Sequence, residues 1–173
     1  MPQLIKDRAI ADDRWTLIRD IDQFATVPAD VPVIVPLAFW QPQRDALLAR
    51  GNVGVWLAPN DDPAALAGDI GQLPLIAVDF PKFTDGRGYS TGRLLREKYG
   101  YTGELRAIGD ILRDQLYYLH ACGFNAFAVR ADRDLADALK GFGDFSDNYQ
   151  TTVDRPVPLF RRREASDGGV LPA

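Results

Sequence analysis

The chain has 173 residues, of which 46% are hydrophobic and 25% are charged, and its formal net charge is -4. This composition excludes collagen, a coiled coil and global disorder. One cysteine and one histidine leave no means for an internal disulfide or a structural zinc site. No apolar run approaches the ~20 residues of a membrane span, and the first residues lack a signal-peptide core. We therefore expect a cytoplasmic protein without a membrane partner.

The first twenty residues predict a β-hairpin. Residues 3–6 and 15–18 are short β-prone runs, and residues 11–13 supply polar material for a turn. We expect one α/β domain over residues 1–163, with this hairpin in residues 1–21 and a flexible tail over residues 164–173.

From residue 31 onward, apolar runs alternate with helix-like segments. The predicted strands are residues 31–37, 53–58, 73–80, 104–108 and 124–129. The predicted helices are residues 43–50, a short segment from 64, 93–99, 110–122 and 135–140. Pro32 and Pro36 place the first strand at a sheet edge or put the prolines at its ends.

This alternation favours right-handed crossovers and a mainly parallel sheet. The expected fold is an open sheet of about five strands with helices on both faces, plus the N-terminal hairpin. A complete eight-stranded barrel needs at least ~200 residues, so the alternative is a partial β/α barrel.

Ligands of open α/β sheets bind at the carboxyl ends of the strands. The predicted strand ends fall at residues 39–40, 59–61, 79–82, 109–110 and 130–133. Among the side chains there, Asp79, Lys82 and Asp110 are the catalytic candidates. Asp79 would bind ligand or act as a base; alternatively, it caps Thr84 or pairs with Lys82 or Arg87. Asp110 would otherwise cap the following helix.

A glycine-rich segment, residues 84–93, follows the third predicted strand and is expected to be a loop. Its glycines would let the backbone approach an anion, and free amides at the start of the next helix would attract it. The expected anion site consists of Gly86, Arg87, Gly88, Ser90, Thr91 and Arg93. The spacing departs from the dinucleotide fingerprint and lacks the P-loop ending. The alternative is a glycine-rich surface turn.

The remaining candidates point away from metal and nucleic-acid chemistry. Cys122 lies on an apolar helix face and is expected to be a buried, inert thiol. His120 is expected on the flank of the same helix, near its end. The run Arg161 to Arg163 is too small for a nucleic-acid patch, and the chain is net negative. Sixteen of the twenty basic residues are arginine. This preference suits anionic ligands or reflects a GC-rich genome.

Four sequence motifs resemble a known bacterial family. They are V-D-F-P-K-F-T-D-G-R-G-Y-S at residues 78–90, R-L-L-R at 93–96, G-E-L-R-A-I-G-D at 103–110 and D-Q-L at 114–116. They resemble the domain-of-unknown-function family number nine hundred and thirty-four, and the likeness extends from Leu4 to Arg162. Members are often called oxidoreductases, and their genes tend to lie beside those for sulfite reductase and sulfate-activation enzymes.

The resemblance implies an accessory role in assimilatory sulfate or sulfite reduction, with sulfite reductase or another sulfur-assimilation protein as partner. It supplies no catalytic residues, and the sequence shows no redox group, so cofactor and enzymatic activity stay undetermined. The alternative is a small enzyme or binding module for a phosphorylated or sulfated metabolite, held by the glycine-rich segment. A homodimer is left open.

Overall fold

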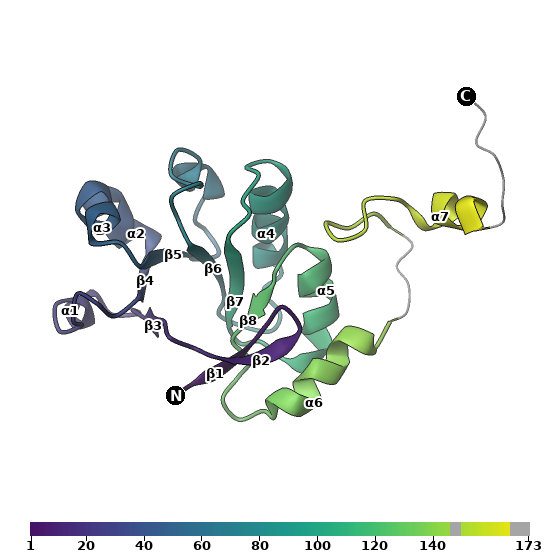
Figure 1. The fold of residues 1–173 in the computed structure, drawn as a ribbon, viewed down its shortest axis with the longest axis horizontal. Coiled ribbons are helices and arrows are strands. Elements are labelled where there is room, and N and C mark those ends of the chain that lie inside the picture. Colours follow the sequence, from purple (N-terminus) through teal and green to yellow (C-terminus); the bar gives the residue numbers. More distant parts are fainter. Residues whose placement is uncertain (146–149, 167–173) are drawn as a thin grey trace.

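A single curled sheet organises the computed structural model, which describes residues 1–145 and 150–166 (Figure 1). Its eight strands lie in the order β2-β1-β8-β7-β6-β5-β4-β3. They are β1 (Gln3–Lys6), β2 (Ala9–Asp12), β3 (Thr16–Leu17), β4 (Val33–Pro36), β5 (Val53–Leu57), β6 (Leu75–Phe80), β7 (Glu104–Gly109) and β8 (Ala126–Phe127). The strands from β3 to β8 are parallel to one another, whereas β1 is antiparallel to both β2 and β8.

The helices that follow the strands lie on the outer face of this sheet, whereas the C-terminal helix stands apart from it (Figure 1). The helices are α1 (Ile21–Phe24), α2 (Leu37–Trp40), α3 (Arg44–Arg50), α4 (Arg87–Glu97), α5 (Leu116–Ala121), α6 (Leu135–Leu139) and α7 (Leu159–Ser166). The 3-10 turns are η1 (Gln41–Gln43), η2 (Pro63–Leu66), η3 (Arg113–Gln115) and η4 (Lys140–Gly143). The strands from β3 to β8 follow chain order, so right-handed crossovers all turn the same way and bring their helices to one face.

Alternating side chains of β6 belong to different faces of the sheet, and the two faces have different surroundings. Ile76, Val78 and Phe80 belong to the main core, which also contains the buried apolar residues of α2, α3, α4 and α5. Leu75 and Ala77 belong to a second cluster on the concave face, to which no helix residue of the described chain contributes. The prediction of helices on both faces of a five-stranded sheet was therefore wrong. The alternative, a partial barrel, is confirmed as an eight-stranded half-barrel.

The N-terminal hairpin exists, but its second arm differs from the prediction. β1 turns into β2 at Asp7 and Arg8, whose φ values of 49° and 63° form a tight turn without glycine. The predicted second arm, residues 15–18, instead contributes β3, which pairs with β4 at the opposite edge of the sheet. Only residues 13–15 link β2 to β3. β2 and β3 are the two edge strands of the sheet, and consecutive Cα atoms are at most about 3.8 Å apart. So short a link can join the two edges only if the sheet curls until they approach each other.

Most predicted elements are present, with shifted bounds. Pro36 ends β4, as a proline at a strand end should, but residues 39–40 lie in α2 and are no strand end. The segment from 64 is the 3-10 turn η2. The predicted last strand shrinks to two residues, β8. The predicted helix 110–122 begins only at η3, and Gly123, with φ 104°, follows its end.

The C-terminal segment contains α7, which spans residues 159–166. The first residues of the predicted tail are therefore helical, and residues 167–173 lie outside the described part of the chain. Over the described residues, no helix has both the length and the apolar character needed to cross a membrane.

Candidate functional site

The glycine-rich segment is part of a helix. α4 begins at Arg87, so the prediction of a loop reaching Gly92 was wrong. A Cβ atom on Gly88 would lie 2.5 Å from Cζ of Phe80, and one on Gly92 would overlap the ring of Phe124. These two glycines let α4 pack closely on the sheet. Tertiary packing thus overrides the low helix propensity of glycine.

The predicted anion-site residues take separate positions on α4. Ser90 and Thr91 lie within the helix, after its first turn has begun at Arg87. Arg87 forks onto the carboxylate of Asp85 at 2.9 and 2.6 Å. Arg93 bonds to Glu97 one turn further on. Arg93 follows Arg87 by six positions, which corresponds to about 9 Å along the helix and about 120° around it. The structure therefore does not bring Arg87 and Arg93 together.

Asp85 occupies the position at the start of α4 where an anion was expected. It accepts a hydrogen bond from the backbone N–H of Arg87 at 3.2 Å. Hydrogen bonds from the Arg87 side chain lower the pKa of Asp85, and Asp85 in turn raises the pKa of Arg87. Gly86 precedes the helix, and Arg87 also donates to Asn60 Oδ1. The N-terminus of α4 thus already has a carboxylate of its own.

The carboxyl ends of the strands bring the catalytic candidates to one edge of the half-barrel. We call Arg19, Asp79, Lys82, Asp110 and Arg130 the carboxyl rim; they follow or end β3, β6, β7 and β8. Asp79 lies in register with Ile108 of β7, and the backbone N–H of Asp110 donates to the carbonyl of Phe80 at 2.7 Å. Asp79 and Asp110 therefore lie at the carboxyl ends of strands, as predicted, and the structure shows that these two strands are neighbours.

Asp79 is a buried carboxylate whose partner is Arg19. Arg19 Nη2 lies 2.7 Å from Asp79 Oδ1, and Asp79 is 6% exposed. The Arg19 guanidinium also lies 5.0 Å from the centre of the Trp56 ring. Trp56 is held in turn by a 3.0 Å hydrogen bond from its Nε1 to the carbonyl of Ile18. The sequence had offered Thr84, Lys82 or Arg87 as partners of Asp79, and Arg19 and Trp56 were missed.

A glycine makes room for this ion pair. Gly109, at the end of β7, has φ 99°, and a Cβ atom there would lie 2.8 Å from Asp79 Oδ1. Any side chain at this position would therefore strain the backbone and crowd the carboxylate.

Asp110 connects two loops of the carboxyl rim. Its carboxylate accepts from the backbone N–H of Phe83 at 3.0 Å and from Arg130 Nη1 at 3.1 Å. Arg130 also forks onto Asp132, with both distances 3.0 Å. Asp110 thus holds the loops after β6 and β8 and does not cap the next helix. Lys82 lies exposed in the loop after β6.

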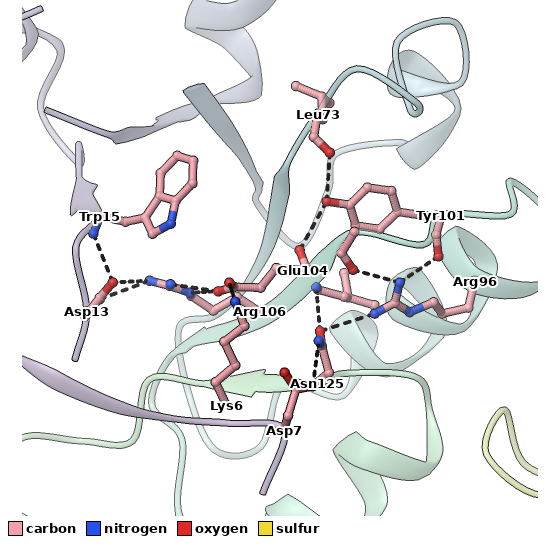
Figure 2. Close-up of polar contacts among 12 residues, drawn as sticks. Lys6, Asp7, Asp13, Trp15, Leu73, Arg96, Tyr101, Glu104, Arg106 and Asn125 are labelled. Atoms are coloured by element: carbon pink, nitrogen blue, oxygen red, sulfur yellow. Dashed lines mark hydrogen bonds and ion pairs between the residues drawn. The ribbon is translucent and has the colours of Figure 1, made fainter. Parts of the chain in front are cut away.

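A second charged cluster fastens the N-terminal segment to the sheet (Figure 2). Arg106 is 3% exposed; its Nε lies 2.8 Å from Glu104 Oε1, and its Nη1 lies 3.0 Å from both carboxylate oxygens of Asp13. Lys6 Nζ completes the cluster at 2.8 Å from Glu104 Oε2. Each buried charge has an opposite partner, which such burial requires. This cluster ties β1, β7 and the β2–β3 linker together.

Neighbouring polar contacts secure the turn before β7 (Figure 2). Arg96 donates to the carbonyls of Tyr101 and Gly103 at 2.6 and 2.9 Å. Tyr101 donates to the carbonyl of Leu73 at 3.1 Å, and burial raises its pKa. Asn125 accepts from the backbone N–H of Leu105 at 2.8 Å. These bonds satisfy buried backbone groups and indicate a structural role.

His120 and Cys122 both lie near the C-terminal end of α5. Cys122 is buried, as predicted, and burial raises the pKa of its thiol. His120 contacts the carbonyl of Phe124 at 3.3 Å and Asp154 at 3.8 Å, and burial lowers its pKa. Within the described ranges, no group of three or more His, Cys, Asp or Glu side chains is placed to hold a metal ion.

The comparisons with known proteins identify a family. A family model described as a bacterial protein of unknown function (DUF934) matches residues 54–160. This range begins within β5 and includes the carboxyl-rim residues Asp79, Lys82, Asp110 and Arg130. No curated protein matches the chain.

Proposed function

The chain belongs to the bacterial DUF934 family, and from this premise we propose that it is an accessory protein of assimilatory sulfate and sulfite reduction, acting with sulfite reductase. The observation that carries the proposal is the match over residues 54–160, which includes all four motifs of the resemblance. The resemblance implies genes beside those for sulfite reductase, and hence a shared pathway. The label of oxidoreductase is part of the same resemblance.

The state of Cys122 supports a role through contacts. A thiol reacts as its thiolate, and burial raises the pKa of Cys122. Its thiol therefore stays protonated near neutral pH and out of reach of a partner protein. Cys122 is also the chain's single cysteine, so it has no second thiol with which to form a disulfide within one chain.

We place the contact with sulfite reductase at the carboxyl rim. The side chains of Arg19 and Arg130 are 44% and 41% exposed, although each pairs with a carboxylate. Lys82 adds an exposed ammonium group between them in chain order. Half-exposed guanidinium groups that are fixed by their own carboxylates are well oriented for hydrogen bonds to acidic groups of a partner.

Deletion of the gene tests the pathway. It should impair growth on sulfate or sulfite but not on cysteine, and a copy with Cys122→Ser should restore growth. Deletion without a sulfur phenotype would remove the pathway assignment. A Cys122→Ser protein that folds but fails to restore growth would show that the thiol is functional.

The alternative function is a binding module for a phosphorylated or sulfated metabolite, with the candidate residues Gly86, Arg87, Gly88, Ser90, Thr91 and Arg93. Because the structure separates these residues along α4, the alternative depends mainly on Arg87. Its side chain is 55% exposed and lies at the start of α4. Titration of the wild type and Arg87→Ala with sulfate, phosphate and adenosine nucleotides tests this alternative. It fails if the wild type binds none of them.

A further inference from the structure

The parallel part of the sheet ends at β8. On one side β8 pairs with the parallel strand β7, and on the other with the antiparallel strand β1. The chain leaves β8 toward α6, whereas β1 begins beside that point. No crossover connects these two strands directly. In α/β sheets, ligands bind outside the carboxyl ends of the parallel strands, and β8 is the last parallel strand at this side of the sheet.

A pocket of about 430 Å³ lies at this point. Its lining combines the residues after β8 with the start of the chain: Pro2, Gln3, Ala128, Val129, Arg133 and Leu135 are among them. Ligand pockets in proteins typically measure about 300–1,000 Å³ and are mostly apolar with a few polar groups. Two other pockets, of about 270 and 230 Å³, are smaller and lined mainly by charged residues.

Two arginines provide positive groups of the pocket, and the one carboxylate in its lining, Asp13, is paired with Arg106. Arg130 is fixed by Asp110 and Asp132, as described above. The backbone N–H of Arg133 donates to the carbonyl of Arg130 at 3.0 Å, so one turn carries both side chains. Over the described residues, the ion pair of Arg133 is a long one, 3.7 Å from its Nε to Asp132. Among residues 1–145 and 150–166, neither Nη group of Arg133 has a hydrogen-bond partner, and the side chain is 55% exposed.

We propose that this pocket binds a small organic oxyanion. Arg133 would hold its carboxylate, phosphate, sulfate or sulfonate group through the planar fork that suits such anions. Ala128, Val129 and Leu135 would contact its apolar body. This site requires no partner protein and is separate from α4, so its existence does not depend on a role in sulfite reduction.

Titration calorimetry with phenyl phosphate and with benzenesulfonate tests the proposal on the full chain. Two control compounds each have one part of the expected ligand: inorganic phosphate has the anionic group without an apolar body, and benzyl alcohol has the apolar body without an anionic group. The wild type should bind at least one of the two organic anions with a Kd of about 1 mM or tighter. Arg133→Met should weaken binding about tenfold or more, because it removes a charge-assisted hydrogen bond.

Two further variants make the test specific. Ala131 lines the pocket and is exposed, so Ala131→Phe should fill the pocket and abolish binding without disturbing the core. Arg93→Met on α4 should leave binding unchanged. The proposal is overturned if neither organic anion binds, or if Arg133→Met and Ala131→Phe bind like the wild type. It is also overturned if inorganic phosphate or benzyl alcohol binds as tightly as the organic anions.

Discussion

Arg19 and Asp79 stand 60 residues apart in the chain, yet they form a 2.7 Å ion pair across the concave face of the half-barrel. Strands β4 and β5 lie between β3 and β6 in the sheet. One side chain can bridge that distance only because the sheet is strongly curled. The pair therefore reports directly on the curvature of the sheet.

Removing Arg19 should destabilise the protein through Asp79. Arg19→Met leaves a carboxylate with 8% side-chain exposure without its partner, and the free energy of unfolding should fall by about 1–3 kcal/mol. Adding Asp79→Asn should recover part of this loss, because the two residues are coupled. Urea denaturation of the single and double variants measures both effects. An unchanged urea midpoint for Arg19→Met would show that the ion pair does not stabilise the curled sheet.

Gly92 within α4 and Gly86, which precedes it, should respond differently to alanine. Gly92→Ala forces a Cβ atom into the ring of Phe124, and overpacking of this kind costs about 1–3 kcal/mol. Gly86→Ala is the matched control, because its nearest neighbour would be Tyr89 Cδ2 at 3.9 Å. The two variants should separate clearly in chemical denaturation. Equal stability would mean that Gly92 does not determine the close contact between α4 and the ring of Phe124.

Much of the fold could be predicted from local patterns. The apolar runs of β5, β6 and β7 were located to within two residues at each end, because strands buried on both faces have a strong signal. The curl was not predictable in this way. It depends on strand order and on the short link between β2 and β3, residues 13–15. The hairpin turn that sets this order, at Asp7 and Arg8, contains none of the usual turn residues except Asp.

The site was predictable only in part, for a related reason. Asp79 and Asp110 follow from the rule of strand ends, but the contact of Arg19 with Asp79 spans the curl and has no local signal. The glycine-rich segment misled the prediction because glycine disfavours helices. Only the rings of Phe80 and Phe124, placed by the sheet, explain why a helix needs glycine there.

The buried cluster around Arg106 should matter more than an exposed ion pair. Arg106→Met leaves Glu104 and Asp13 without their shared partner, and breaking a buried pair costs about 3–5 kcal/mol. Arg93→Met is the matched control, since Arg93 pairs with Glu97 at the surface and such pairs contribute about 0.5 kcal/mol. Guanidinium chloride denaturation should rank the two variants in this order. A similar small effect for both would contradict a structural role of the cluster.

Acid should destabilise the protein partly through His120. Burial, assisted by Arg8, lowers the pKa of His120 in the folded state, although Asp154 opposes this effect. The stabilisation is therefore fully present above the unfolded pKa of about 6.5 and is lost as the pH falls below it. His120 is the single histidine, so its imidazole titration by NMR is unambiguous. A folded-state pKa at or above the unfolded value would contradict this prediction.

The thiol of Cys122 should react slowly in the native protein. Burial raises its pKa and restricts access, so a colourimetric thiol reagent at pH 8 should modify the native chain far more slowly than the chain in urea. Comparing the two rates provides the measurement. Rapid modification of the folded protein would show an accessible thiolate and reopen a redox role for this residue.

The most direct test of the proposed function is titration calorimetry of the purified chain with assimilatory sulfite reductase from the same organism. The wild type should bind saturably. Lys82→Glu at the carboxyl rim should weaken binding about tenfold or more, because it places an acid where we expect a positive group to face the partner. Lys98→Glu is the control, because Lys98 lies at the C-terminal end of α4, whereas Lys82 lies in the loop before its N-terminal end. This variant should bind like the wild type. Absence of binding by the wild type, or equal binding by both variants, would contradict a contact with sulfite reductase through the carboxyl rim.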